Sequence, residues 1–552
     1  MTENTKIIKG SGGGGGNESP PPPYRAPDSL HSRSFATIQD LISEGEIEGF
    51  ATASKEGLTK GTTAYNNASL KDVFLDDTPI LVSTADSSNP SDTEFNFQDV
   101  TFKSKFGTAS QTAMTGIPDI DESRAPSGVQ VVVENSDGTD SGGLTGAVTR
   151  QITNTDVDAV IVTLTWPQIQ IFEDDGDLRG DRVDYKIQLQ HDSGGFVDKI
   201  TSFVSGRTAD AYARDHRIQL NESFTTVDIR VIRITADSST STRVNAFQFT
   251  SFQEVIDNES NYPNSAYTAL RLDSKQFNRI PPRKYRIRGI KVRIPGAGAS
   301  NSGTPTVDLQ NGRIVYPDGY IFNGVMGAAV YTNCPAMCLL DLLTNTRYGL
   351  GNHIIDSNLD LFSFVAASRY ANELVDDKTG AGTQEARFSC NVNIQNPKEA
   401  FDAINELSSV MRCMPIWSAG SVTISQDKPL SPSYVFNLAN VGEGGFSYSG
   451  SSLKQRHSVI SVSYFNMDSK EVDFEVVEDA TAIAKLGTIL KQVKAFACTS
   501  RGQAARLGRA ILFGEQNESE VVSFTTSIDA GIVVRPGSVI EVNDPVRSGA
   551  RR

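Results

Sequence analysis

Residues 333–351 (NCPAMCLLDLLTNTRYGLG) constrain the fold most, because they read as one buried helix with defined ends. Asn333 or Cys334 can cap the helix, and Pro335 suits its first position, where the missing N–H costs nothing. Two glycines at the end of the segment allow the chain to leave. Apolar residues recur on one side with a helical period: Met337, Leu340 and Leu343. Strand-like segments precede this helix, and mixed helices and strands follow it, so we expect it to join two parts of the molecule.

The composition narrows the class of protein. A length of 552 residues suggests about three or four domains, and 38% hydrophobic with 21% charged residues is typical of a globular protein. A net charge of −15 argues against a general nucleic-acid binder or a binder of anionic membranes.

Five widely spaced cysteines do not form a disulfide framework, which favours reduced thiols. The N-terminus has no apolar run of a secretory signal. Residues 319–340 carry no charge, but turn residues interrupt them, which favours a hairpin and a helix over a membrane span.

The segments before residue 300 are mainly β-type. Residues 1–34 hold runs of glycine and proline and are predicted to be a flexible or extended arm. Residues 66–74 and 78–82 are predicted to be paired strands around an Asp76-Asp77 turn. Residues 83–250 alternate short apolar runs with Ser, Thr, Asp and Gly, a pattern that predicts a β-sandwich or barrel. The fold class is therefore mainly β with α/β parts.

A strongly basic strand follows. Residues 279–293 hold seven cations and no acid. A one-residue bulge at Gly289 would place five of the cations on one face and the apolar residues on the other. These five are Lys284, Arg286, Arg288, Lys291 and Arg293. The face is interpreted as a solvated strand face, as a charged lumen lining or as an intersubunit contact; DNA binding as the main role fits the overall acidity least.

Motifs for catalysis or metal binding are absent from the sequence. No Gly-x-Ser-x-Gly is present, and Ser451 and Lys454 have Ser-x-x-Lys spacing without its partner motifs. Cys334 and Cys338 lie four residues apart, but no His/Cys pair with ligand spacing accompanies them. Residues 173–177, with Asp181 nearby, form an acidic turn that departs from the calcium-loop register, which leaves an ion near residues 174–181 undecided. No catalytic, cofactor or metal residue is assigned, and no enzyme is expected.

Eight motifs occur in the order found in one known family. They are ISEGEIEG at 42–49, YPN at 262–264, DSKQF at 273–277, YRIRG at 285–289, the segment 338–351 with its RYG, SVMRCMP at 409–415, QDKP at 426–429 and FACTSRGQA at 496–504. Over about residues 35–545, the chain resembles the N-terminal half of the tail-tip attachment (host-specificity) proteins, the protein J family of phage lambda and related siphophages.

The resemblance implies a non-enzymatic, homotrimeric hub that closes the distal end of the tail tube. It implies a place at the distal tail tip of the virion, with synthesis in the host cytoplasm. The implied partners are further copies of the chain, the distal tail protein, the tape-measure protein and other tip proteins. A host outer-membrane receptor would be bound only through a C-terminal region that is not present here. Phage DNA would contact the chain at most while it passes through the tip. Such a hub would organise its neighbours and support host attachment and DNA ejection.

The resemblance also suggests a domain plan. Residues 1–34 form the arm, residues 35–82 and 256–345 a first hub β-barrel, and residues 83–255 an inserted β-sandwich-like region. Residues 346–440 form an α+β hub domain. Residues 441–552 form a second hub β-barrel with a helical insertion, and this barrel is expected to be truncated. Two alternatives stay open from the residues alone: a tail-associated peptidoglycan or glycan hydrolase, and a carbohydrate-binding β protein.

Overall fold

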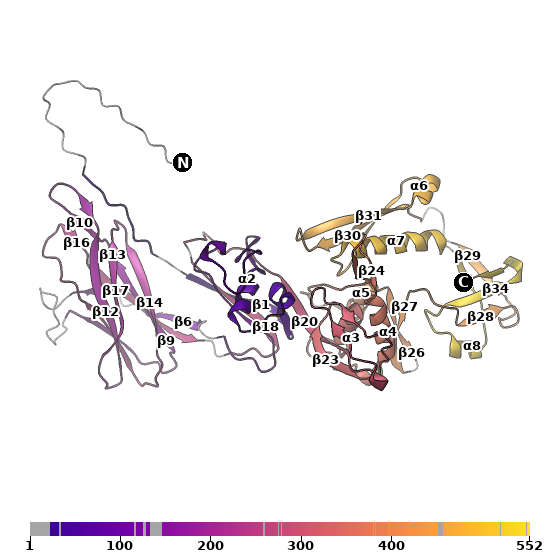
Figure 1. Cartoon of the computed structure of the whole chain (residues 1–552). Coiled ribbons are helices and arrows are strands. Elements are labelled where there is room, and N and C mark those ends of the chain that lie inside the picture. Colours follow the sequence, from indigo (N-terminus) through magenta and orange to yellow (C-terminus); the bar gives the residue numbers. More distant parts are fainter. Residues whose placement is uncertain are drawn as a thin grey trace, which may run out of the picture.

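The computed structural model describes residues 23–32, 35–114, 118–124, 129–132, 146–257, 260–273, 275–277, 279–378, 380, 382–396, 398–418, 420–450, 456–518, 520–547 and 549–551. Four units follow one another in a row (Figure 1). We name them the sandwich (118–257), the first body (35–114 with 260–290), the helical body (291–430) and the C-terminal body (434–551). The described chain is mainly β with a few helices, as the sequence predicted.

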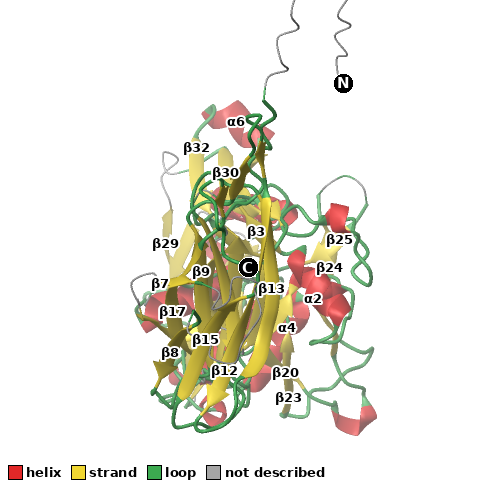
Figure 2. Cartoon of the chain, turned by 90° about the vertical axis from the view of Figure 1, so that its left-hand side faces the viewer, coloured by secondary structure: helices red, strands yellow, loops and turns green. Residues whose placement is uncertain are grey.

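The sandwich consists of two antiparallel sheets, whose strands fill the front of Figure 2. One sheet has the order β13 (Val197–Gly206), β12 (Asp181–His191), β15 (Val227–Arg233) and β8 (Val148–Ile152). The other has the order β14 (Tyr212–Gln219), β9 (Ala159–Trp166), β17 (Phe247–Asp257) and β6 (Pro118–Arg124), with β7 (Val129–Val131) also on β17. Strands β10 (Gln170–Phe172), β11 (Leu178–Arg179) and β16 (Arg243–Val244) form a small third sheet. Alternate residues of β8, β9, β12, β15 and β17 face a continuous core around Trp166 and Phe247.

The first segment of the first body extends further along the sequence than the domain plan predicted, to residue 114 instead of residue 82. Its main sheet has the order β1 (Phe35–Glu44), β18 (Ser265–Asp273) and β5 (Thr101–Phe106). The aromatic residues of 95–106 pack on its core, so residues 83–106 belong here and not to the inserted region. The inserted region therefore starts at β6, because β5 hydrogen-bonds to β18 and its apolar side chains have their partners in this body.

The predicted strand at 66–74 is mostly helix. Helix α2 (Thr63–Leu70) follows the short α1 (Ala51–Lys55), and the Thr62 hydroxyl accepts a hydrogen bond from the Tyr65 amide at its start. Tyr65, Ala68 and Ser69 are buried, so tertiary packing decides the conformation here. The predicted turn is confirmed, because Asp76 and Asp77 both have positive φ between β3 (Val73–Leu75) and β4 (Thr78–Pro79).

One long strand, β20 (Ile287–Pro295), connects the first body to the helical body. Its first half pairs with β2 (Ile47–Phe50) and its second half with β23 (Met326–Tyr331). Behind it lie α3 (Pro335–Thr344), α4 (Leu361–Ala371) and α5 (Ala400–Val410). The remaining strands of this body form pairs: β21 (Thr306–Val307) with β22 (Ile314–Val315), β24 (Leu374–Asp376) with β25 (Gln384–Ala386), and β26 (Cys413–Ser418) with β27 (Ser421–Gln426).

Helix α3 confirms the predicted buried helix. Cys334 is its N-cap, Pro335 its first residue, and Met337, Leu340 and Leu343 are buried in the core of the helical body. The helix ends at Thr344, and the chain folds back so that the Leu350 amide donates to the Leu342 carbonyl at 2.9 Å. A Cβ at Gly349 would lie 2.2 Å from that carbonyl oxygen, so only glycine permits this close return. In the described residues, no helix is long and apolar enough to cross a membrane.

The C-terminal body contains three separate sheets, so the described residues do not close the predicted second barrel. Its largest sheet has the order β31 (Glu471–Glu478), β30 (Val459–Asn466) and β32 (Leu490–Lys494), and α7 (Arg501–Asn517) covers one face. The Ser500 hydroxyl caps α7 by accepting a hydrogen bond from the Gln503 amide at 3.1 Å. The other elements are β28 (Tyr434–Asn437), β34 (Ile540–Asp544) and β35 (Gly549–Arg551) in one sheet, β29 (Ser447–Gly450) with β33 (Glu520–Ser523), and helices α6 (Ala480–Leu486) and α8 (Ile528–Val533).

Part of the N-terminal segment is tied to the sandwich. Residues 23–32, which we name the strap, lie along it in Figure 1. The Leu178 amide donates to the Tyr24 carbonyl at 2.8 Å, and the Ser29 amide donates to the Arg207 carbonyl at 2.9 Å. The Arg207 guanidinium is 2.7 Å from Asp28, and Leu30 packs on the sandwich core. The strap is therefore held in place, whereas the rest of the predicted arm, residues 1–22 and 33–34, lies outside the described residues.

Gly206 provides a test of the strap, because it has a positive φ of 151° and a Cβ there would lie 2.5 Å from the Ser29 hydroxyl oxygen. We expect Gly206→Ala to displace the strap and to raise hydrogen exchange at the Ala26 and Ser29 amides about tenfold or more, equivalent to about 1.4 kcal/mol. Gly195→Ala is the control, since no heavy atom lies within 4 Å of its added Cβ. Equal exchange in the two variants would contradict a close-packed strap.

The sandwich core also contains a buried histidine. The His216 ring lies 2.8 Å (Nε2) from the Tyr185 hydroxyl, and burial and the nearby Arg214 charge lower the pKa of His216 to about 4. The unfolded chain binds this proton near pH 6.5, so the sandwich should lose stability as the pH falls from about 6.5 to 4, by up to roughly 3 kcal/mol. Urea unfolding followed by Trp166 fluorescence in a Trp417→Phe background measures this loss. In His216→Gln the same pH interval should have little effect; an unchanged acid sensitivity would contradict the assignment.

Candidate functional site

The five predicted cations do not share one face. Strand β19 (Arg283–Tyr285) pairs with β3. The strand is interrupted at Arg286, and β20 then pairs with β2. The β2–β20 register runs through Gly289 without a shift, so the predicted bulge is wrong. Because alternation continues unbroken, Arg288 falls on the same face as Val292 and Ile294 and is buried with them, opposite Lys291 and Arg293.

Each of the other four cations forms an ion pair within the chain. The closest N–O distances are 2.5 Å for Lys284–Asp77, 2.6 Å for Arg286–Asp72, 2.6 Å for Lys291–Glu46 and 2.7 Å for Arg293–Asp356. Asp72 is fully buried, and this burial raises the pKa of its carboxyl group. The hydrogen bond from the Thr52 amide and the Arg286 charge act in the opposite direction. The pairs tie β19 and β20 to the first body and, through Asp356, to the helical body. A lumen or intersubunit role for these cations stays a prediction.

Arg288 is the buried member of the set. Its side chain donates to the Ser54 hydroxyl at 3.1 Å and to the carbonyls of Leu309 and Gln310, and its guanidinium lies 5.1 Å from the Tyr331 ring centroid. A buried guanidinium is stable only when its donors are paired, which these carbonyls achieve. Arg288 therefore joins β20 to α1 and to the loop before β22.

This placement predicts unequal costs for two formally similar substitutions. Arg288→Met should lower the free energy of unfolding by about 2 kcal/mol or more, because it leaves two carbonyls without their donor. Lys284→Met should cost less than about 1 kcal/mol, because the Lys284–Asp77 pair is more than half exposed. Thermal or urea unfolding of the two variants compares them directly. Equal and small costs would support the solvated basic face that the sequence suggested.

Three of the family motifs meet at one place, between the first body and the helical body. We name it the joint; a cavity of about 420 Å³ lies there. Its lining comes from motif 42–49, motif 262–264, β20 and the segment after α3: Gly45, Glu46, Asn264, Ile290, Lys291, Asn345, Thr346, Arg347 and Tyr348. The sequence shows each of these motifs but not that they lie together in space. The only indication in the sequence is that all three belong to the set of motifs shared with the family.

The groups of the joint are paired with one another. Arg347 Nε lies 2.5 Å from a Glu44 carboxylate oxygen, and the Gly45 amide donates to the Asn264 carbonyl at 2.6 Å. The Tyr348 hydroxyl donates to Asp341 at 2.5 Å, and burial raises the pKa of both groups. The Arg347–Glu44 pair joins the two bodies, whereas the other two contacts each lie within one body and shape the lining of the cavity. None of these paired groups is an activated nucleophile. The joint is therefore a structural site.

The acidic turn in the sandwich is partly neutralised. Carboxylate oxygens of Glu173, Asp175 and Asp177 lie within 4.8 Å of one another. The Arg179 Nε atom is 3.1 Å from Glu173, and the Tyr24 amide of the strap donates to Asp177 at 2.7 Å. Asp181 pairs instead with Arg243 at 2.7 Å. The turn thus serves as an anchor for the strap, and an ion at this place stays undecided.

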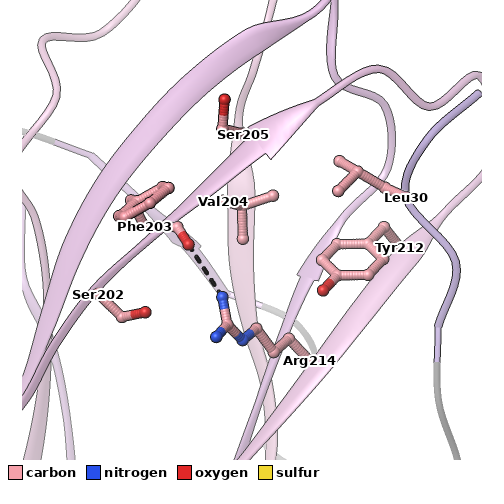
Figure 3. Close-up of a pocket in the computed structure, with 7 residues that line it drawn as sticks. All are labelled: Leu30, Ser202, Phe203, Val204, Ser205, Tyr212 and Arg214. Carbon is pink, nitrogen blue, oxygen red and sulfur yellow. Dashed lines mark hydrogen bonds between the residues drawn. The ribbon is translucent and has the colours of Figure 1, made fainter. Parts of the chain in front are cut away.

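A second cavity, of about 300 Å³, lies at the open side of the sandwich (Figure 3). Strands β13 and β14 form its walls with Leu30 of the strap, and the Arg214 guanidinium donates to the Phe203 carbonyl at 2.9 Å. If the chain binds carbohydrate, this cavity with its aromatic and hydroxyl lining is where a sugar would bind.

The cysteines are structural. Burial raises the pKa of the Cys413 thiol to about 12 and of the Cys498 thiol to about 11, so both stay protonated and unreactive at neutral pH. Burial also raises the pKa of Cys334, whose sulfur lies 3.2 Å from the Ser368 hydroxyl oxygen. All five cysteines are free thiols.

Comparison with known proteins agrees with this architecture. Residues 130–258 match the family model "Tip attachment protein J, FNIII-A domain", and residues 399–552 match a phage tail protein family. The chain is 30% identical over 483 residues to the "Tip attachment protein J" of Escherichia phage SECphi27, covering 87% of this chain. It is 30% identical over 526 residues to the protein of the same name from Escherichia phage SECphi4, covering 95% of this chain.

The chain is a relative of phage tip attachment protein J. It spans about two fifths of the length of these relatives, 37% and 42% respectively. The FNIII-A match coincides with the sandwich, and the phage tail match runs from α5 through the C-terminal body. Both relatives are named for attachment at the tail tip and neither for an enzymatic activity, in agreement with the expectation from the sequence.

Among solved structures, the 43 kDa tail protein of prophage MuSo2 from Shewanella oneidensis is similar at 12% identity. The match covers 73% of this chain and 90% of that one, with a TM-score of 0.25.

Proposed function

We propose that this chain is a structural hub of a phage tail tip, where it organises neighbouring tip proteins and closes the distal end of the tail tube. The observation that carries the proposal is the distribution of exposed apolar side chains. Most of them in the described chain lie after residue 350, in the helical and C-terminal bodies, and include Phe401, Trp417, Ile528, Ile532 and Val546. Exposed apolar surface on this scale is typical of proteins that bind protein partners.

The connections between the bodies support the same function. Strand β20 passes from the core of the first body to that of the helical body, and the joint holds the two with paired charges. At the other side, the turn of the β30–β31 hairpin reaches back to the first body, where the Lys470 ammonium lies 3.5 Å from the Phe74 ring centroid. A scaffold needs this kind of bracing, because its docking faces must keep fixed positions.

The finer parts of the proposal come from the family resemblance. They are a homotrimer, contacts with the distal tail and tape-measure proteins, support of host attachment, and opening of the tip for DNA ejection. The hydrolase alternative has no supporting observation in the described residues, and the carbohydrate-binding alternative has the cavity beside the strap.

The proposal predicts the phenotype of a phage that encodes this chain and carries an amber codon in its gene. In a non-suppressing host, tails should lack a closed distal tip in negatively stained particles, and infectivity should be lost. The same phage grown in a suppressing host is the control. Tails that are closed at the tip and eject DNA normally without the chain would overturn the proposed function.

A further inference from the structure

The three-stranded sheet of the C-terminal body is covered on one face only. Helix α7 packs on the side of Ile460, Val462 and Val477. The strand pairing places alternate residues on the opposite face, which we name the outer face. Apart from the buried Val459, its apolar side chains are exposed: Phe465 of β30 by 42%, Val472, Phe474 and Val476 of β31 by 63%, 60% and 53%, and Leu490 of β32 by 53%. A contiguous row of this kind on a strand at a sheet edge is a docking surface.

The two edges of this sheet carry opposite charges. Edge strand β31 has four acidic residues and no basic one, whereas edge strand β32 has two lysines and no acidic residue. Glu475 and Lys491 already form ion pairs with Arg501 and Glu515. By contrast, Glu478 and Lys494 lie on the outer face and have no ion-pair partner among the described residues. Each edge therefore offers a charge that the other edge of a second copy would neutralise.

We propose that the outer face is the contact between copies of this chain, with the acidic edge of one copy beside the basic edge of the next. The inference rests on the proposed function only in needing several copies at one tip. A twofold contact that pairs β31 with β31 would place acid against acid, which like-charge repulsion disfavours. When the unlike edges of two copies lie side by side, the contact is head-to-tail, and such a contact repeats by rotation until a ring closes.

The position of the sheet suits this contact. The β30–β31 hairpin is held at its turn by Lys470 on Phe74 of the first body and along its length by α7. The outer face is therefore presented in one orientation, which a closed ring requires. Partner proteins of other kinds have the remaining apolar surface available, such as the exposed Ile528 and Ile532 of α8.

Charge reversal on the full chain tests the proposal, with the mass measured by light scattering over a range of concentrations. The wild-type chain should form an oligomer. Glu478→Lys should weaken association about tenfold or more, because it places like charges together, and Lys494→Glu should do the same. The double variant E478K/K494E should recover association, because each contact again joins unlike charges. Phe474→Ser should also weaken it, through loss of apolar contact.

The controls lie on the sandwich and change the same residue types. Glu222→Lys and Phe203→Ser replace an exposed acid and an exposed aromatic side chain there, and both should associate like the wild type. Unchanged melting temperatures show that all variants fold. A wild-type chain that stays monomeric at every concentration would overturn the inference, as would reversal variants that associate normally. In the second case the oligomer uses another face, and the tail-tip function, which the amber phage tests, is unaffected.

Discussion

The structure depends on strand β20, because one strand supplies residues to two hydrophobic cores. Its first residues contribute to the core of the first body, and Val292 and Ile294 lie in the core of the helical body. The strand must therefore pair with β2 and then with β23 in one continuous register. A slip of one residue would turn Arg288 outward and expose Val292, so the packing of both bodies fixes that register.

Ion pairs add to the connection that strand β20 makes between the two bodies. Arg286, Lys291 and Arg293 bind acids on three different elements, and Arg347 binds Glu44 across the joint. Apart from Arg286–Asp72, whose carboxylate is fully buried, these pairs are partly exposed and contribute little to stability one at a time. Their effect here is geometric, since each pair joins segments that are far apart in the sequence. Bodies connected in this way present their remaining surfaces in fixed relative positions, which suits a scaffold for other proteins.

The sequence predicted local features with a short physical cause. The Pro335 start and apolar side of α3 and the Asp76-Asp77 turn could be predicted, because each depends on residues close together in the chain. The sequence failed where distant contacts decide. Residues 66–70 are helical because Tyr65 and Ala68 are buried by the first body, and residues 101–106 belong to that body because they pair with β18. The joint was invisible for the same reason, since its residues come from three distant motifs.

The sequence alone determined the class of fold, the position of helix α3 and the relation to the protein J family, since these follow from periodicity, capping residues and ordered motifs. The tertiary structure decided what the basic strand does. Alternation along β20 is a local property, but which side meets a core depends on β2, β23 and the loop that supplies carbonyls to Arg288. The tertiary structure likewise showed which apolar residues are left without a cover, because exposure is a property of the packed molecule and not of the residue type.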